Sequence, residues 1–132
     1  MLHAGSDYLA GVHVLVVEDN DDSREALAKI LRYCGALVTV ACSTDEAHRS
    51  LEILRPHAQL TDVDRPHEGL RLIRAVGAIA RAHGVQIPAI GMTDGYSEQV
   101  EFWAAGLSDL LVKPLDPMEP CRVVRRHVKH SK

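Results

Sequence analysis

The sequence predicts an α/β fold, a doubly wound sheet of five parallel strands covered by helices on both faces. Short apolar runs of strand length alternate along the chain with longer segments in which apolar residues recur at helical spacing. Five such strand-helix units follow one another, an order that requires right-handed helical crossovers between parallel strands. The length of 132 residues is that of one domain.

The first unit has the strongest pattern. Residues 12–17 (VHVLVV) form a β-branched run of strand length that ends abruptly at two acids. Asp22 or Ser23 is a suitable N-cap for the helix that follows, in which apolar residues recur at helical spacing. Gly35 stands where a helix C-terminus favours a left-handed residue, so we expect the helix to end there.

The second unit and the third strand follow directly. Residues 37–41 form the second strand, Thr44 is expected to cap the next helix, and Pro56 stops that helix. Residues 58–61 are expected to form a weaker third strand. The reason is Gln59, which is polar where a central strand favours an apolar residue.

The third and fourth helices flank a strand over residues 88–92. Four residues mark the stripe of the third helix: Leu70, Ile73, Gly77 and Ala80. The fourth helix is short and carries Val100 and Trp103 on one face, and we expect Trp103 to pack in the core.

The fifth strand is expected over residues 110–112, and Pro117 suits the first turn of the last helix. Three residues of this helix should face inward: Cys121, Val124 and Val128. Its basic residues complement the dipole at a helix C-terminus, so we do not expect a nucleic-acid surface. They are Arg122, Arg125, Arg126, Lys129 and Lys132.

Composition excludes several classes of protein. With 46% hydrophobic and 25% charged residues the chain is not disordered, and its net charge of −3 favours no class of partner. Three cysteines without a CxxC pair are typical of small buried residues in a reducing cytoplasm, and eight histidines without ligand spacing are expected at the surface. No secretory signal or apolar run of membrane-spanning length occurs, so a cytoplasmic protein is expected, with residues 1–11 as an extension and 12–130 as the domain.

Polar residues follow four of the predicted strands. Glu18 and Asp19 end the first strand, Asp62 the third, Thr93 the fourth and Lys113 the fifth. In an open parallel sheet, these carboxyl ends lie at one edge, where the chemistry of such folds is located.

This set of side chains suits phosphoryl chemistry. Three converging carboxylates repel one another unless their pKa values rise or a cation neutralises them, and oxygen ligands favour Mg²⁺. A hydroxyl and an ammonium group nearby can stabilise phosphoryl oxygens. A carboxylate held at the metal can act as the nucleophile and form an acyl phosphate.

Four motifs together cover nearly the whole chain. They are VLVVEDN at residues 14–20, the spacing of Pro56, Asp62 and Pro66, the IGMT that ends at Thr93, and AAGLSDLLVKP at residues 104–114. In this order they closely resemble the receiver domains of two-component response regulators, including those attached to hybrid sensor kinases. The resemblance implies a flavodoxin-like fold with strand order 2-1-3-4-5.

The resemblance also implies roles for individual residues. Asp62 would be the phosphoacceptor. Mg²⁺ would be held by Glu18, Asp19 and Asp62 together with the backbone carbonyl of Asp64. Thr93 would move toward the phosphoryl group, Lys113 would be its ion-pair partner, and the Lys113-Pro114 peptide would be cis.

Four positions depart from the family pattern. Leu110 stands where most receivers have a switching Tyr or Phe, and Asp94 where a small residue borders the entrance to the site. Together with Asp64, Asp94 adds negative charge that Arg65 partly offsets, so we expect slow phosphorylation by small anionic donors. The loop at residues 66–69 is one residue shorter than in the family, which leaves the start of the third helix open.

The expected function is that of a receiver, not of an enzyme. It would take a phosphoryl group from a histidine kinase or phosphotransfer protein and contact a downstream protein, or a second copy of itself, through its fourth helix, fifth strand and fifth helix. The alternative is a pseudo-receiver that binds partners without phosphorylation, as Leu110 and Asp94 suggest. A dehalogenase-like phosphatase is disfavoured because Glu18-Asp19-Asn20, at the end of the first strand, does not supply the Asp-x-Asp of its motif.

Overall fold

The computed structural model describes residues 6–95 and 100–128, and these form one sheet with helices on both faces. The five strands are all parallel in the order β2-β1-β3-β4-β5, as expected. In chain order the elements are β1 (His13–Val17), α1 (Asp21–Tyr33), β2 (Leu37–Ala41), α2 (Thr44–Ile53), β3 (Ala58–Asp62), α3 (Pro66–His83), β4 (Ala89–Thr93), α4 (Val100–Ala105), β5 (Leu107–Val112) and α5 (Glu119–Val128).

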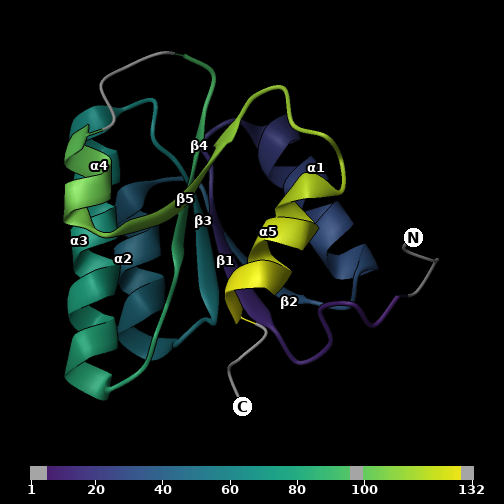
Figure 1. Ribbon diagram of the computed structural model, residues 1–132, viewed down its shortest axis with the longest axis horizontal. Coiled ribbons are helices and arrows are strands. Elements are labelled where there is room, and N and C mark those ends of the chain that lie inside the picture. The colour runs from purple at the N-terminus through teal and green to yellow at the C-terminus, as the bar shows by residue number, and fades with distance from the viewer. Residues whose placement is uncertain (1–5, 96–99, 129–132) are drawn as a thin grey trace.

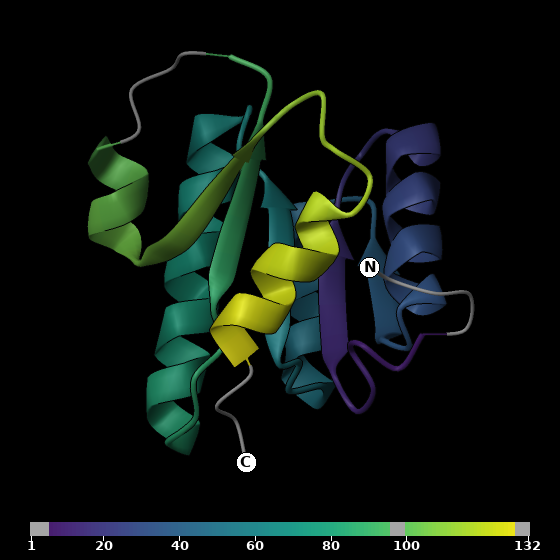
Figure 2. The same cartoon turned by 45° about the vertical axis from the view of Figure 1, so that its right-hand side comes forward.

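The core has two halves, one on each face of the sheet. Helices α1 and α5 cover one face, and α2, α3 and α4 lie on the other (Figures 1 and 2). Strand β1 contributes side chains to both halves of the core, because alternate side chains point to opposite faces of the sheet. Val14 and Val16 pack under α1 and α5, whereas Leu15 and Val17 pack under α2 and α3. Burial on both faces explains why residues 14–17 of this strand are an unbroken apolar run.

Two helices begin with caps one to three residues earlier than the sequence predicts. Asn20 caps α1, its Oδ1 accepting from the Ser23 N–H at 2.9 Å, and Ser43 caps α2, its Oγ accepting from the Glu46 N–H at 3.1 Å. Asp22, Ser23 and Thr44 were therefore the wrong caps. Asn and Ser are at least as good as the predicted cap types, and both adopt the extended backbone that a cap requires.

The third strand is not weak. Residues 58–61 are all buried at the centre of the sheet, and the Gln59 Nε2 donates to the Thr61 Oγ1 at 2.8 Å. The polar side chain is thus partly satisfied within its own strand. Helix α3, whose start the sequence leaves open, begins at Pro66. It ends at His83, where the following Gly84 adopts a left-handed conformation with a φ of +66°.

The region of α4 and β5 differs most from the prediction. Phe102 is buried, whereas Trp103 is 47% and Val100 71% exposed, so the predicted inward face points to solvent. Phe102 packs on Gly69 of α3, where an added Cβ would lie 3.2 Å from its ring. Strand β5 starts at Leu107, three residues earlier than expected.

Three further expectations concern α5 and the cysteines. The helix begins at Glu119 because the chain around Pro117 forms a turn, in which the Asp116 carboxylate accepts from the Met118 N–H at 2.9 Å. Its expected inward residues are buried. Cys34 and Cys121 are buried as well, but Cys42 is exposed in the turn after β2.

The histidines lie at or near the surface where the structure describes them. The six histidines within the described ranges are exposed or half-buried, while His3 and His130 lie outside those ranges. No helix in the described part of the chain is both long and apolar enough to cross a bilayer.

Residues 6–12 pack against the ends of α1 and α5. Leu9 is fully buried, and its N–H donates to the Cys34 carbonyl at 2.7 Å. The Arg125 guanidinium lies 4.6 Å from the centre of the Tyr8 ring, close enough for a cation-π contact. Gly35 has a φ of +96° and leaves no room for a Cβ, which would lie 3.0 Å from the Ser6 carbonyl oxygen.

This packing predicts that the N-terminal segment contributes to the stability of the domain. Leu9→Ala should lower the free energy of unfolding in urea by about 2 to 5 kcal/mol, the usual cost of truncating a buried leucine. The control Ile53→Ala, at a residue 82% exposed, should change it by less than about 0.5 kcal/mol. Equal stabilities for the two variants would contradict the packing of Leu9.

Candidate functional site

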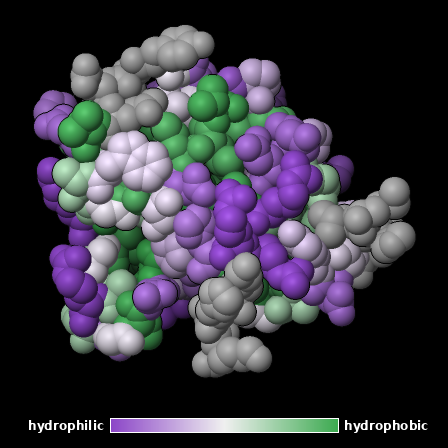
Figure 3. All heavy atoms as spheres, viewed as in Figure 1, coloured by the Kyte–Doolittle hydropathy of each residue, from purple (hydrophilic) through white to green (hydrophobic). Residues whose placement is uncertain are grey.

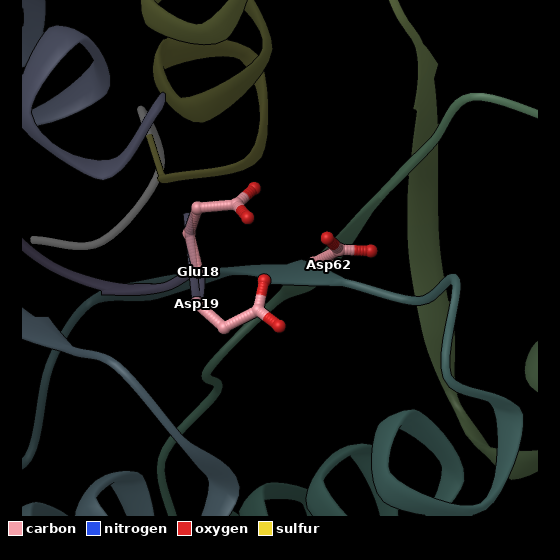
Figure 4. A group of neighbouring side chains, drawn as sticks. All are labelled: Glu18, Asp19 and Asp62. Atoms are coloured by element: carbon pink, nitrogen blue, oxygen red, sulfur yellow. The ribbon is translucent and has the colours of Figure 1, made fainter. Parts of the chain in front are cut away.

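Three carboxylates converge at the carboxyl ends of the neighbouring strands β1 and β3. Val17 pairs with Thr61 in the sheet, so the residues that follow, Glu18 and Asp62, lie side by side. Asp19 comes next after Glu18, and Figure 4 shows all three carboxylates turned toward the same space. One oxygen of each lies within 4.8 Å of the others.

Glu18 is the most buried of the three, with a side chain 2% exposed. Burial raises its pKa above the ordinary value, and the nearby charge of Asp62 acts in the same direction. The Asn20 N–H, which donates to Glu18 Oε2 at 3.1 Å, and the ammonium group of Lys113 oppose this shift. The surroundings of Glu18 therefore disfavour its ionised form, and a further positive charge nearby would stabilise that form.

Lys113 brings such a charge from the end of β5. Its Nζ lies 3.3 Å from Asp62 Oδ2, 3.4 Å from Glu18 Oε1 and 3.9 Å from Asp64 Oδ2. Partial burial disfavours the ammonium form, but the carboxylates of Asp62 and Glu18 outweigh this and raise the pKa of Lys113. The peptide bond between Lys113 and Pro114 is cis, as the resemblance implies.

Thr93 is fully buried at the end of β4, and its hydroxyl already has a partner. Thr93 Oγ1 donates to Asp64 Oδ1 at 2.6 Å, and the Asp94 N–H lies 3.3 Å from both Asp64 oxygens. Asp64 reaches this place because its own N–H donates to Asp62 Oδ1 at 2.8 Å, which turns the chain. The sequence did not predict this contact, although the spacing of Asp62 and Asp64 is its only visible signal.

A second cation lies at the mouth of the site. Arg65 Nη2 is 2.6 Å from Asp19 Oδ2, and Nη1 is 3.8 Å from Glu68 Oε2. These side chains line a cavity of about 50 Å³ together with Glu18 and Asp62. From the sequence, Arg65 was expected only to offset part of the negative charge at the rim, and its direct contact with Asp19 was not predicted.

Leu110 lies on the β5 strand against β4. An added Cβ at Gly91 would be 3.1 Å from Leu110 Cδ1, so the leucine side chain packs over this glycine. It is half-buried and apolar. It therefore has no polar group that could exchange a buried position for an exposed one.

The donor set fits a hard divalent cation. Glu18, Asp19 and Asp62 supply only oxygen atoms, as Mg²⁺ prefers. The partial exposure of Asp19 and Asp62 leaves room for the water ligands that Mg²⁺ usually keeps.

A family profile described as the response regulator receiver domain matches residues 14–125. The chain belongs to this family. It is a signalling domain of two-component systems rather than a classical enzyme.

Curated relatives include an uncharacterized protein and a named response regulator. The chain is 37% identical to an uncharacterized 14.6 kDa protein from Leptolyngbya boryana, over 90% of this chain and 92% of that protein. It is 32% identical to the response regulator MprA from Mycobacterium ulcerans, over 92% of this chain. It spans about half, 52%, of the length of MprA.

Solved structures have the same fold. The receiver domain of the sensor histidine kinase PA1611 from Pseudomonas aeruginosa has a TM-score of 0.78 and 31% identity, covering 91% of this chain and 99% of that one. That receiver domain has a magnesium ion coordinated in its active site cleft. A CheY-like receiver from Methanospirillum hungatei has a TM-score of 0.80 at 21% identity, over 89% and 94% of the two chains, and shows the shared fold.

The raised pKa of Glu18 predicts how stability depends on pH in metal-free protein. A carboxyl group with a raised folded pKa stabilises the fold below its unfolded pKa, and this contribution is lost as the pH rises through the folded value. Glu18→Gln should therefore raise the thermal midpoint at about pH 7 in a chelator, and this gain should vanish near pH 4, where the wild-type group is protonated.

The amide oxygen of the variant can still accept the Asn20 N–H, so that hydrogen bond is retained. Glu52→Gln is the matched control because Glu52 is exposed on α2, and it should show no such pH-dependent gain. A Glu18→Gln protein that is less stable than wild type at about pH 7 would contradict the cost assigned to this buried carboxylate.

Proposed function

We propose that this domain accepts a phosphoryl group on Asp62 from a histidine kinase or histidine phosphotransfer protein, with Mg²⁺ bound, and signals through contact with another protein. The observation that carries the proposal is the position of the Asp62 carboxylate, which lies within 4.8 Å of oxygens of Glu18 and Asp19 and 3.3 Å from Lys113 Nζ. Candidate metal ligands and a cationic side chain thus lie next to the carboxylate that would act as the nucleophile.

Glu18, Asp19, Asp62 and the backbone carbonyl of Asp64 would hold the metal. When bound, Mg²⁺ offsets the repulsion between the carboxylates and an incoming phosphoryl group. An oxygen of Asp62 attacks phosphorus, the new O–P bond forms, and the N–P bond of the donor histidine breaks. The imidazole leaves with the bonding electron pair and takes a proton from solvent.

Lys113 and Thr93 would then serve the phosphoryl oxygens. Lys113 already touches Asp62, so it needs only a small displacement to pair with a phosphoryl oxygen. Thr93 first has to release Asp64, because its hydroxyl donates to that carboxylate at 2.6 Å. This exchange would couple phosphorylation to the loop after β4, because the Asp94 N–H contacts the same carboxylate.

A groove next to the site suits the phosphodonor. It has a volume of about 400 Å³ and runs between α1 and the connection from β5 to α5. Its lining is largely apolar, with Leu27 and Ile30 on one side and Pro114 and Leu115 on the other. Glu18 and Lys113 also line it, so a protein bound in the groove would bring its histidine next to Asp62.

The output surface would be the face formed by α4, β5 and α5. Val100, Trp103 and Val112 are exposed there, which favours a protein partner or a second copy of the chain. Figure 3 shows hydrophobic surface near the end of β5 and hydrophilic surface over α5.

The described arginines of α5 are engaged within the protein, which supports a protein partner over a nucleic acid. Arg122 pairs with Asp116 at 3.5 Å, Arg126 with Asp109 at 3.1 Å, and Arg125 stacks on Tyr8. The three free cysteines agree with a reducing cytoplasm as the place of action.

The second candidate is a pseudo-receiver that binds partners without being phosphorylated. Two observations favour it: the hydroxyl of Thr93 is already satisfied by Asp64, and Leu110 lacks a switching group. The two functions differ in whether Asp62 reacts.

Phosphorylation is tested by intact mass spectrometry after incubation with MgCl₂ and a small phosphodonor. Wild type should gain the mass of one phosphoryl group, whereas Asp62→Asn should not. Asp45→Asn, an exposed aspartate on α2, is the matched control and should react like wild type. If wild type gains no mass, like Asp62→Asn, and beryllofluoride causes no NMR shift at Thr93, the pseudo-receiver is favoured.

The groove predicts a variant that separates the two kinds of phosphodonor. Ala26 is exposed on α1 and lines the groove, so Ala26→Arg should slow phosphotransfer from the cognate kinase at least about tenfold by obstructing docking. Its reaction with the small phosphodonor should not change.

Ala82→Arg is the matched control, since Ala82 is exposed on α3 and away from the groove. The kinase is found by profiling phosphotransfer from the histidine kinases of the source organism. Normal transfer to Ala26→Arg would exclude this groove as the docking site.

A further inference from the structure

Arg65 and Lys113 each neutralise part of the negative charge of the acidic site. Within the described ranges, Glu18, Asp19 and Asp62 form ion pairs with Arg65 and Lys113 alone. Lys113 pairs with Glu18 and Asp62, and Arg65 pairs with Asp19 at 2.6 Å. Asp19 is therefore the one carboxylate of the three whose counter-ion lies on the loop that begins α3.

We propose that Arg65 is an internal counter-ion that competes with the divalent cation for Asp19. Cation binding would require the Arg65 guanidinium to leave Asp19 and turn toward Glu68. The inference rests on the metal site of the proposed function and adds a positioning residue that sets the affinity of that site.

The contacts of Arg65 suit a displaceable group. Its side chain is 66% exposed and that of Asp19 is 45% exposed, so water and salt screen their attraction. The guanidinium has a second acceptor ready, because Glu68 Oε2 lies 3.8 Å from its other terminal nitrogen. Arg65 also caps α3 without a side-chain hydrogen bond to the helix, so moving its side chain leaves the helix intact.

Competition follows from charge and space. A guanidinium at 2.6 Å from Asp19 Oδ2 occupies one of the two oxygens of this carboxylate and neutralises its charge. Mg²⁺ binds its oxygen ligands at about 2.0 to 2.1 Å, which would place two cationic groups on one carboxylate. An arginine that instead oriented Asp19 for the metal would be expected to be buried and fixed, whereas this one is mostly in solvent.

The test is the affinity for MgCl₂ alone, measured by titration of backbone amide chemical shifts. The amides of Asn20 and Asp64 report on the site because they donate to Glu18 and Asp62. Arg65→Gln should bind Mg²⁺ roughly two- to fivefold more tightly than wild type, the range that corresponds to a screened ion pair.

Arg71→Gln is the matched control. It removes the same charge from a side chain of similar exposure, 62%, whose acidic neighbour Asp45 lies on α2 and outside the site. Any effect of net charge alone should appear in both variants. Arg65→Lys keeps the charge and should bind Mg²⁺ closer to wild type than Arg65→Gln does.

The outcomes are distinct. Tighter binding by Arg65→Gln than by Arg71→Gln, with the difference shrinking in high salt, supports the inference. Equal affinities, or weaker binding by Arg65→Gln, overturn it while leaving the metal site in place. If wild type and all variants show no Mg²⁺-dependent shifts at Asn20 and Asp64, the metal site of the proposed function fails, and the inference fails with it.

Discussion

The repulsion among carboxylates at the ends of β1 and β3 is the constraint on which the rest of the site depends. Parallel pairing of the two strands brings Glu18 next to Asp62, and Asp19 follows immediately. Two like charges about 5 Å apart repel by a few kcal/mol at the effective dielectric of a protein surface. The fold tolerates this arrangement because Lys113 directly follows β5, two strands from β3, and its ammonium group reaches the carboxylates at the same edge of the sheet.

Each group that would meet a ligand already has an internal partner. Lys113 holds Asp62, Arg65 holds Asp19, and Asp64 accepts from the hydroxyl of Thr93. In the proposed function, a cation and a phosphoryl group would exchange these partners rather than fill unpaired sites. The cost of breaking the internal contacts would then offset part of the gain from binding, and the same contacts would transmit the change to the loops after β3 and β4.

The sequence predicted the architecture and the convergence of the site well, because both depend on the periodicity of apolar residues and on strand order. The continuous run of β1 and the polar residues at the strand ends were sufficient for that. Side-chain partners were harder to predict. The contact of Arg65 with Asp19 joins residues of different loops, and the contact of Asp64 with Thr93 spans 29 positions and depends on the turn after Asp62.

Local errors have physical causes of the same kind. Trp103 was predicted inward, but Phe102 takes that position because Gly69 of α3 leaves space for its ring. Helix periodicity indicates which residues share a face of the helix. It does not indicate which of these faces packs against the neighbouring helix. Likewise, Asn20 and Ser43 cap their helices because of their backbone conformation, which a list of good cap residues does not reveal.

A crystal structure of the protein grown with MgCl₂ and beryllofluoride tests the central claim most directly. The proposed function predicts a beryllofluoride group bonded to Asp62, with Mg²⁺ held by Glu18, Asp19, Asp62 and the Asp64 carbonyl. It also predicts fluorine atoms next to Lys113 Nζ and Thr93 Oγ1, with Thr93 released from Asp64. A structure with no adduct on Asp62, and with the contacts of Lys113 and Thr93 unchanged, would contradict it.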